Sequence, residues 1–274
     1  MTETPFFDFP VLIDKRDRIA IITLNRPEKL NAWNRQMEAG VFAALEAFAH
    51  DDEVRVILIK GAGRAFCAGG DMSAISQISE GAAPTQPDSR PYWFPLTIGK
   101  PIVAAIRGAC VGIGFQQALC CDVRFVADDL KLIAPYSRLG LIGELGITWS
   151  LGQLVGPSAA LDILLSGRTI GADEALRLGL ANRICKADEL FDDTFAYCRM
   201  LAENCSPWSM RMIKSQVYAD ATSDLGSAYD RSDTLLKRAF EGADIAEGVA
   251  AFREKRQPAF ESLAGDLAII PMPS

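Results

Sequence analysis

The stretch GAGRAFCAGGDM, residues 61–72, follows a predicted strand and precedes a predicted helix. It places four glycines, at positions 61, 63, 69 and 70, around the small apolar run Ala65–Ala68. Glycine allows positive φ and lets a ligand approach the backbone closely. Free N–H groups at a helix entrance, together with the helix dipole, favour negative charge. This first bend therefore predicts an anion or oxyanion site.

The sequence around the first bend alternates strands and helices. Residues Arg18–Pro27 alternate and are rich in β-formers, so they predict a strand that ends in a turn. The segment Asn34–Asp51 carries apolar residues at steps of three and four, as an amphipathic helix does. The run Val54–Gly61 then predicts a buried strand. The order strand, helix, strand is typical of an α/β fold.

The same pattern recurs downstream. A predicted strand at Pro101–Gly108 runs into a second bend, ACVGIG at 109–114, then a helix at Phe115–Cys121 and a strand at Asp122–Asp128. A third bend, LGLIGELG at 139–146, opens a helical segment at 147–156. The polar, Gly- and Pro-rich stretch Ser79–Pro91 predicts a loop.

From residue 189 the strand signal disappears. Helices are predicted at Leu190–Asn204, Pro207–Ala219, Leu225–Phe240 and Ile245–Lys255. We therefore predict an α/β core at residues 1–188 and a helical subdomain at 189–274. Apolar residues on more than one face of this tail are what an oligomer contact requires.

Composition narrows the function. The 274 residues carry a net charge of −7, which argues against nucleic acid, since that binding needs clustered Lys and Arg. Seven cysteines without a CxxC pair indicate reduced core residues in a cytoplasmic protein and no metal site. Neither a signal peptide nor an apolar run long enough for a membrane span is visible.

Three classes of ligand use a glycine-rich helix entrance. A dinucleotide fingerprint fails because Phe66 stands where its last glycine belongs. A nucleoside triphosphate loop would end in Gly-Lys-Ser/Thr, which is absent here. The remaining use is an oxyanion hole, with one amide from each of two bends directed at one developing oxyanion.

Five segments in order resemble the crotonase family, which includes the enoyl-CoA hydratases and isomerases. They are ITLNRPEKLNAWN (22–34), AFCAGGDM (65–72), KPIVAAIRGACVGIGFQQALCCDVRFVAD (100–128), LVGPSAALDILLSGRTIGADEALRLGLANRI (154–184) and FREKRQPAF (252–260). The resemblance covers nearly the whole chain. It implies a spiral of repeated β-β-α units with a C-terminal helical subdomain, assembled as a homotrimer or hexamer.

The resemblance also implies an acyl-CoA thioester as substrate and no cofactor beyond that coenzyme A. The thioester oxygen would be held by the amides of Gly70 and Ile113, or of Gly112 or Gly114 if the second bend is shifted by one residue. It places Lys29, Leu30 and Ala32 along the CoA, and Ala68, Asp71 and Met72 beside the adenine and the first bend. Lys255, Arg256 and Phe260 are further candidates, in a tail that would close the CoA pocket.

This chain departs from the hydratase pattern where that pattern has two glutamates. Gln116 and Tyr136 stand at those positions, and neither supplies a carboxylate base; both are retained as substrate-binding candidates. Glu144 in the third bend resembles the acidic residue of several isomerase-type members, with Gly143 replacing a proline. One carboxylate can remove a proton at one carbon and return it at another. Isomerisation is therefore predicted, with enoyl-CoA hydration and non-catalytic acyl-CoA binding as alternatives.

Glu144, His50 and Cys67 also fit structural roles. Glu144 could instead be a helix-start residue favoured by the dipole. His50, the one histidine, ends the first amphipathic helix and fits a surface position there. Cys67 lacks a histidine to activate it, so it is expected to be a small core residue. A protease triad built on His50 is excluded on the same ground.

Overall fold

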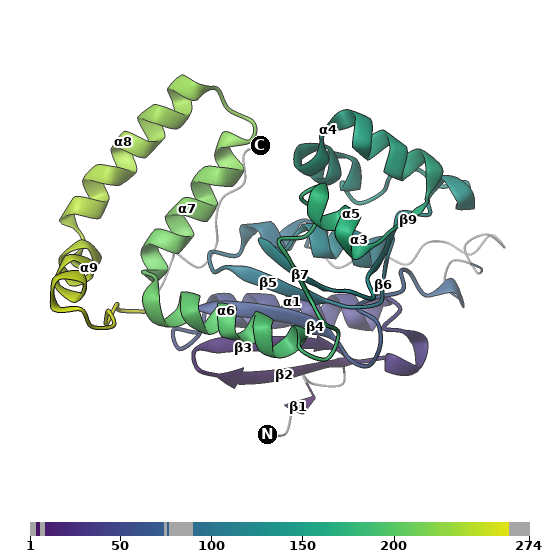
Figure 1. Ribbon diagram of the computed structural model, residues 1–274, viewed down its shortest axis with the longest axis horizontal. Helices are drawn as coiled ribbons and strands as arrows, with labels where there is room; N and C mark the ends of the chain where they lie inside the picture. The colour runs from purple at the N-terminus through teal and green to yellow at the C-terminus, as the bar shows by residue number, and fades with distance from the viewer. Residues whose placement is uncertain (1–3, 6–8, 74–75, 77–89, 263–274) are drawn as a thin grey trace.

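The computed structural model describes residues 4–5, 9–73, 76 and 90–262. Its centre is a seven-stranded sheet in the order β1-β2-β3-β4-β5-β7-β10 (Figure 1). β1 and β2 extend the sheet antiparallel to β3, and every pair from β3 to β10 is parallel. The strands are β1 (Thr4–Pro5), β2 (Val11–Arg16), β3 (Ile19–Leu24), β4 (Val56–Gly61), β5 (Ile102–Ile106), β7 (Val123–Ala127) and β10 (Arg183–Cys185).

Helices cover both faces of this sheet. In β3, Ile19 and Ile21 join the apolar cluster under α6 (Leu190–Asn204), while Ala20 and Ile22 join the cluster under α1 (Arg35–Ala49). This alternation is the two-residue period of a strand, and burial on both faces explains why every residue of β3 is apolar or Thr. The strand predicted at 18–27 and the helix predicted at 34–51 are confirmed.

A second, three-stranded sheet carries the second bend. It contains β6 (Ala109–Val111), β8 (Lys131–Ile133) and β9 (Thr169–Ile170) in that order. β6 leads directly into α3 (Ile113–Leu119), so the helix predicted at 115–121 begins two residues earlier. The reason is Gly112, whose φ of 51° turns the chain at once and leaves Gly114 inside the first helical turn.

The third bend also differs from its prediction. A short 3-10 helix, η3 (Ser137–Leu139), stands between β8 and the glycines, so no strand runs directly into this bend. The bend ends at Gly146, whose φ of 81° begins α4 (Ile147–Ser166). α5 (Ala172–Arg177) then leads to the last strand of the main sheet.

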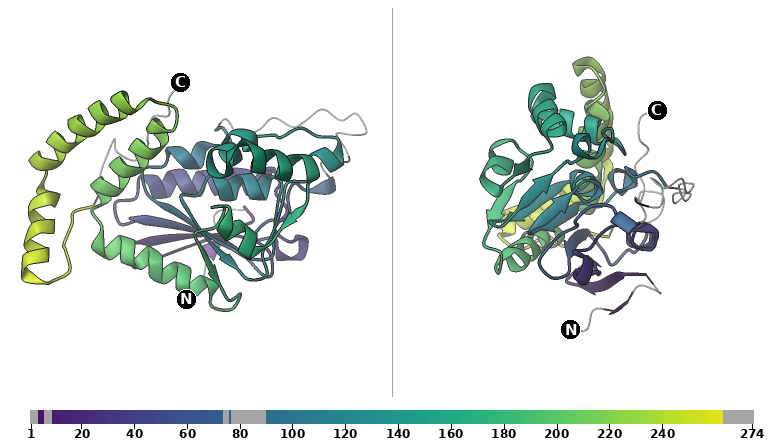
Figure 2. Two further views of the ribbon diagram at one scale, coloured as in Figure 1. Left: turned by 45° about the horizontal axis from the view of Figure 1, so that its top comes forward. Right: turned by 90° about the vertical axis from the view of Figure 1, so that its right-hand side faces the viewer.

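The C-terminal helices lie within two residues of their predicted bounds. They are α6, α7 (Pro207–Asp220), α8 (Leu225–Glu241) and α9 (Ala243–Glu254). α6 packs on the sheet, whereas α8 and α9 project from one end of the molecule (Figures 1 and 2). The division of the chain at residue 188 stays a prediction. None of the described helices combines the length and apolarity that crossing a bilayer demands.

The parallel register brings the bends to one edge of the sheet. Leu24 at the end of β3 lies opposite Gly61 at the end of β4, and Lys60 lies opposite Ala105 in β5. The carboxyl ends of β3, β4 and β5 therefore lie at the same edge of the sheet. In parallel sheets, ligands bind outside the carboxyl ends of the strands.

Candidate active site

The first and second bends pack against each other. The Cys67 N–H donates to the Ala109 carbonyl at 3.0 Å, and the Val111 N–H donates to the Cys67 carbonyl at 2.9 Å. A Cβ built on Gly69, where φ is +100°, would lie 3.3 Å from the Val111 oxygen. The fold thus joins two glycine-rich bends that are about forty residues apart in sequence.

The amides of Gly70 and Ile113 are left unbonded. Neither N–H donates a hydrogen bond to another residue in the described ranges. Trp33 forms a bridge to Gly70 in which its N–H donates to the Gly69 carbonyl at 2.7 Å, so the Gly70 amide takes no part. Ile113 is the first residue of α3, where an N–H has no partner within the helix.

Of the second-bend amides considered from the sequence, that of Gly112 already has a hydrogen-bond partner. The Gly112 N–H donates to the Ile133 carbonyl at 2.9 Å, which makes it unavailable to a ligand. Gly114 is glycine because of packing. A Cβ built there would lie 2.6 Å from Cβ and 2.8 Å from the carbonyl oxygen of Cys67, closer than real atoms approach.

Asn31 links the turn after η1 (Pro27–Lys29) to the first bend by hydrogen bonds. It is fully buried in that turn, with φ of 56°. Its Nδ2 donates to the carbonyls of Ala62 at 2.9 Å and Ala65 at 2.8 Å, and its Oδ1 accepts from the Arg26 N–H at 2.9 Å. Sequence reasoning missed this residue, although Asn is the side chain that best tolerates a left-handed position.

The residues assigned to CoA by resemblance lie together around this turn. The Ala68 N–H donates to the Leu30 carbonyl at 2.9 Å. The Arg26 guanidinium donates to the Ala32 carbonyl and to Asp71, and Lys29 Nζ lies 3.5 Å from the same carboxylate. Arg26 holds the pKa of Asp71 well below its usual range, so Asp71 is an ionised anchor of the bend. Met72 is exposed beside it.

Glu144 is a half-buried carboxylate with no internal partner. Its side chain makes no hydrogen bond or ion pair that involves the described parts of the chain. Nor does it cap α4, because the N-cap is Gly146 and no side chain bonds the free amides there. The alternative, a helix-start residue favoured by the dipole, stays a prediction. A carboxylate left free in a partly buried site is available for chemistry.

The Glu144 loop is held by Gln116. The Gln116 Nε2 donates to the Leu145 carbonyl at 3.0 Å, and Leu145 itself adopts a left-handed φ of 57°. Such strain in a residue other than glycine persists only where the surroundings enforce it, and it is common at functional sites. Gln116 thus fixes the backbone beside Glu144.

Two tyrosines lie within electrostatic reach of Glu144. Burial, and then the charge of Glu144, raise the pKa of Tyr136. Burial, and then hydrogen bonding to Glu38, raise the pKa of Tyr92, to which Glu144 also contributes. Both phenols therefore stay protonated at neutral pH, and neither is a base.

The three bends, at residues 61–72, 109–114 and 139–146, follow one another along the chain in the order that the family resemblance implies. A family model described as Enoyl-CoA hydratase/isomerase matches residues 14–263. The chain belongs to the enoyl-CoA hydratase/isomerase family. The predicted resemblance is thereby confirmed.

Similar proteins agree with this membership. The chain is 36% identical over 253 residues to a "Probable enoyl-CoA hydratase echA8" of Mycobacterium bovis, covering 91% of this chain and 97% of that protein. It is 32% identical over 248 residues to the 1,2-epoxyphenylacetyl-CoA isomerase of Escherichia coli K12, covering 88% and 94%. A crystal structure of a probable enoyl-CoA hydratase/isomerase from Mycobacterium abscessus superposes with a TM-score of 0.86 at 28% identity, covering 92% and 99%. The predicted crotonase-like fold is confirmed.

In this hydratase/isomerase family member, His50 lies away from the bends, whereas Cys67 packs between them. His50 ends α1 on the surface, with Nδ1 2.9 Å from the Glu46 carbonyl, as predicted. Burial raises the pKa of the Cys67 thiol to about 12, which agrees with an inert core residue. All seven cysteines are free, and six are buried. No metal-ligand cluster of three or more His, Cys, Asp or Glu occurs within the described ranges.

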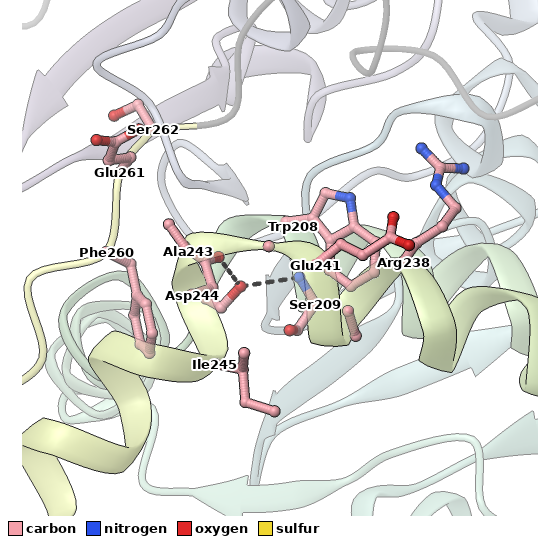
Figure 3. A pocket seen from close by; sticks show the side chains of 13 residues that line it. Trp208, Ser209, Arg238, Glu241, Ala243, Asp244, Ile245, Phe260, Glu261 and Ser262 are labelled. Carbon is pink, nitrogen blue, oxygen red and sulfur yellow. Dashed lines mark hydrogen bonds between the residues drawn. The ribbon is translucent and has the colours of Figure 1, made fainter.

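Two cavities lie near opposite ends of α7. One, of about 320 Å³, is lined by Gln116, Leu145 and residues of η2 (Phe94–Thr97), α4 and α7. A larger one, of about 580 Å³, lies among Trp208, Arg238, Asp244 and Phe260 (Figure 3). Of the two, only the first touches the Glu144 loop, at Leu145 and Gly146.

The tail candidates Lys255, Arg256 and Phe260 follow α9, which lies far from α3 in Figure 1. Arg256 donates to Glu247 at 2.6 Å, and Phe260 lines the larger cavity. Within one chain the fold does not bring these residues to the bends.

The loop predicted at Ser79–Pro91 lies outside the described residues over 79–89.

Replacing Asn31 with Ala is expected to lower the free energy of unfolding by about 3 kcal/mol, because one buried and two partly buried backbone groups lose their partner. Urea unfolding of Asn31→Ala beside wild type measures this. The control is Asn204→Ala, an exposed amide at the end of α6, which should change stability by less than about 0.5 kcal/mol. Equal stabilities of the two variants would contradict the assigned role.

Proposed function

We propose that the protein moves a proton on an enoyl-CoA thioester and so shifts its double bond. In this proposal the Gly70 and Ile113 N–H groups receive the thioester oxygen, and Glu144 is the acid/base. The observation that carries the proposal is the pairing of two unbonded amides at joined bends with a carboxylate that has no internal partner. The substrate is an acyl-CoA, with no cofactor beyond its coenzyme A.

The main-chain amides would make the enolate accessible. Removing a proton next to a thioester carbonyl leaves negative charge on its oxygen, and preorganised donors stabilise that charge without reorganising. One such donor is typically worth about 3 to 4 kcal/mol in the transition state. Because both donors belong to the backbone, they depend on the bends rather than on any side chain.

One carboxylate is sufficient for isomerisation. Glu144 would take a proton from one carbon as carboxylate and return it to another as carboxylic acid. Hydration would need water activated by the same single group, because Gln116 cannot ionise and the raised pKa of Tyr136 keeps its phenol neutral. Hydration remains the second candidate, favoured by the hydratase names of several relatives. A non-catalytic acyl-CoA binder is the third.

Product analysis in water labelled with oxygen-18 separates isomerisation, hydration and binding without turnover. Purified protein is mixed with 3-enoyl-CoA and with 2-enoyl-CoA, and products are identified by mass spectrometry. Interconversion of the two esters without label in the product is expected. Label on the β-carbon would instead identify a hydratase. Binding of both esters without turnover would leave only the binder.

The remaining assignments belong to the same proposal. Lys29 is exposed beside the first bend, where an ammonium group would meet CoA phosphate. Leu30, Ala32, Ala68, Asp71 and Met72 would line the CoA as the resemblance implies. Cytoplasmic location also stays a prediction.

A homotrimer or hexamer is the proposed assembly. α8 buries none of its residues, and it exposes Leu225, Tyr229 and Phe240. Large exposed apolar faces commonly become protein contacts. Sedimentation velocity should give a mass of three or six chains of 29.7 kDa, and a stable monomer would contradict the assembly.

A further inference from the structure

The turn at residues 26–33 controls the direction of the Gly70 amide. The Trp33 N–H donates to the Gly69 carbonyl at 2.7 Å, and the Asp71 N–H donates to the Trp33 carbonyl at 2.9 Å. The Gly69 carbonyl and the Gly70 N–H belong to one trans peptide, in which the two groups point in opposite directions. The bond from Trp33 therefore turns the Gly70 N–H away from Trp33.

The Arg26 side chain bridges the two segments that meet at this peptide. Its Nη1 donates to the carbonyl of Ala32, the residue before Trp33, at 2.6 Å. Its Nη2 donates to Oδ2 of Asp71, the residue after Gly70, at 2.8 Å. The side chains of Arg26 and Asp71 are only 13% and 12% exposed, so salt and water screen this ion pair little. One planar guanidinium thus sets how far apart Trp33 and Gly70 lie.

The Asp71 carboxylate stays charged in this position. Hydrogen bonds from Arg26 and then from Ser73 lower the pKa of Asp71 well below its usual range. Its other oxygen, Oδ1, accepts from the Ser73 hydroxyl at 2.7 Å. Lys29 Nζ lies 3.5 Å from Oδ2, but half of the Lys29 side chain is exposed. Removing the Arg26 guanidinium would leave a nearly buried carboxylate without its closest cation, so the end of the bend would move.

The start of the first bend has anchors that do not depend on the Arg26 side chain. Asn31 Nδ2 donates to two carbonyls of the bend, those of Ala62 and Ala65. These bonds hold the part of the bend that precedes Gly70 in the sequence. Loss of the guanidinium should therefore disturb the end of the bend, where the Gly70 N–H lies, and leave its start in place.

We propose that Arg26 is a positioning residue of the oxyanion hole: its bonds to the Ala32 carbonyl and the Asp71 carboxylate fix the direction of the Gly70 N–H. This inference rests on the proposed function, because that function makes Gly70 an oxyanion donor. Both Nη atoms of the guanidinium are bonded inside the protein, so Arg26 acts through its neighbours and not by touching the substrate. Its loss should weaken polarisation of the thioester carbonyl more than affinity for the ester.

Infrared difference spectroscopy of bound hexanoyl-CoA, labelled with carbon-13 at its carbonyl, tests the inference without turnover. Hydrogen bonds to the carbonyl oxygen lower its stretching frequency, so the shift on binding reports on the oxyanion hole. Wild type should show this shift, and Arg26→Gln should lose about half of it, the share of one of two donors. The dissociation constant of the ester, measured by calorimetry, should change by less than about threefold.

Two further measurements distinguish positioning from a loss of charge. The kcat of Arg26→Gln on enoyl-CoA should fall about 10²-fold, as when one oxyanion donor is displaced. Arg26→Lys keeps the charge but cannot bridge both partners in one plane, so it should not restore the infrared shift.

The matched control is Arg231→Gln. It removes the ion pair of Arg231 with Asp220, which joins α8 to the end of α7 and lies outside the bends. This variant should keep the wild-type infrared shift and kcat. If Arg26→Gln does not fold, Asp71→Asn removes the same ion pair from its other end and should lose the same share of the shift.

Failure of the inference and failure of the proposed function give different results. An unchanged shift in folded Arg26→Gln, or in Asp71→Asn, overturns the inference, and so does a full shift in Arg26→Lys. An intact shift in Arg26→Gln with binding weakened more than about tenfold would make Arg26 a substrate contact instead. Wild type that binds hexanoyl-CoA without any carbonyl shift would refute the oxyanion hole, and with it the proposed function itself.

Discussion

Glu144→Gln should lower kcat on enoyl-CoA by about 10²- to 10⁴-fold, the usual contribution of a general acid/base. Glutamine has nearly the same shape but cannot carry a proton between two carbons. The Glu144 side chain makes no internal hydrogen bond or ion pair within the described ranges, and its backbone carbonyl keeps the bond from the Ile147 N–H. Stability and CoA-ester affinity should therefore stay near wild type.

Single-turnover spectrophotometry with saturating 3-enoyl-CoA measures this effect on the chemical step. Glu203→Gln is the control, since Glu203 is an exposed glutamate on α6, far from the bends in sequence. It should leave kcat unchanged. If Glu144→Gln turns over as fast as wild type, another group moves the proton and the mechanism is wrong.

Gly114→Ala should lower kcat/KM by about 10²- to 10³-fold, the loss expected when one oxyanion donor is displaced. The new Cβ would lie 2.6 Å from Cβ and 2.8 Å from the carbonyl oxygen of Cys67, so one bend must move. The movement would separate the Gly70 amide from that of Ile113. By helix propensity alone the same change would stabilise α3 by about 1 kcal/mol. A loss of activity would therefore be due to the contact between Gly114 and Cys67 and not to a weaker helix.

Gly152→Ala in α4 provides the comparison. A Cβ built there has no neighbour within 4 Å, and the residue is also inside a helix. It should keep full activity and gain up to about 1 kcal/mol of stability. Thermal unfolding monitored beside the kinetics shows whether Gly114→Ala remains folded. Wild-type kcat/KM in a folded Gly114→Ala protein would show that bend contact is not required for catalysis.

The long elements and the glycine bends could be predicted because their signals are local. α1 and α6 to α9 repeat their apolar residues over many turns, and β3 and β4 are continuous apolar runs between turn residues. The start of α3 could not be placed as well, since Gly112 and Gly114 both read as bend residues until Cys67 packs against one of them. Strands of two or three residues, such as β6 and β9, carry no periodicity.

The site residues divide in the same way. Gly70, Ile113 and Glu144 were found from motif position, and their catalytic roles remain proposals. Asn31 was missed because two of its three partners, the Ala62 and Ala65 carbonyls, are brought near only by the parallel register of β3 and β4. Tyr218, which lines the cavity of about 320 Å³, was missed because its hydroxyl reaches Asp122 Oδ1, at 2.9 Å, across about a hundred residues of chain.

By itself the sequence determined the α/β class, the family and the residue types at the two bends, because glycine content and hydrophobic period are properties of neighbouring residues. Only the tertiary structure decided which amides stay free. The Gly112 N–H is occupied by Ile133, whereas the Gly70 and Ile113 N–H groups have no partner among the described residues. A hydrogen bond of this kind depends on where a distant strand lies, and no local pattern encodes that position.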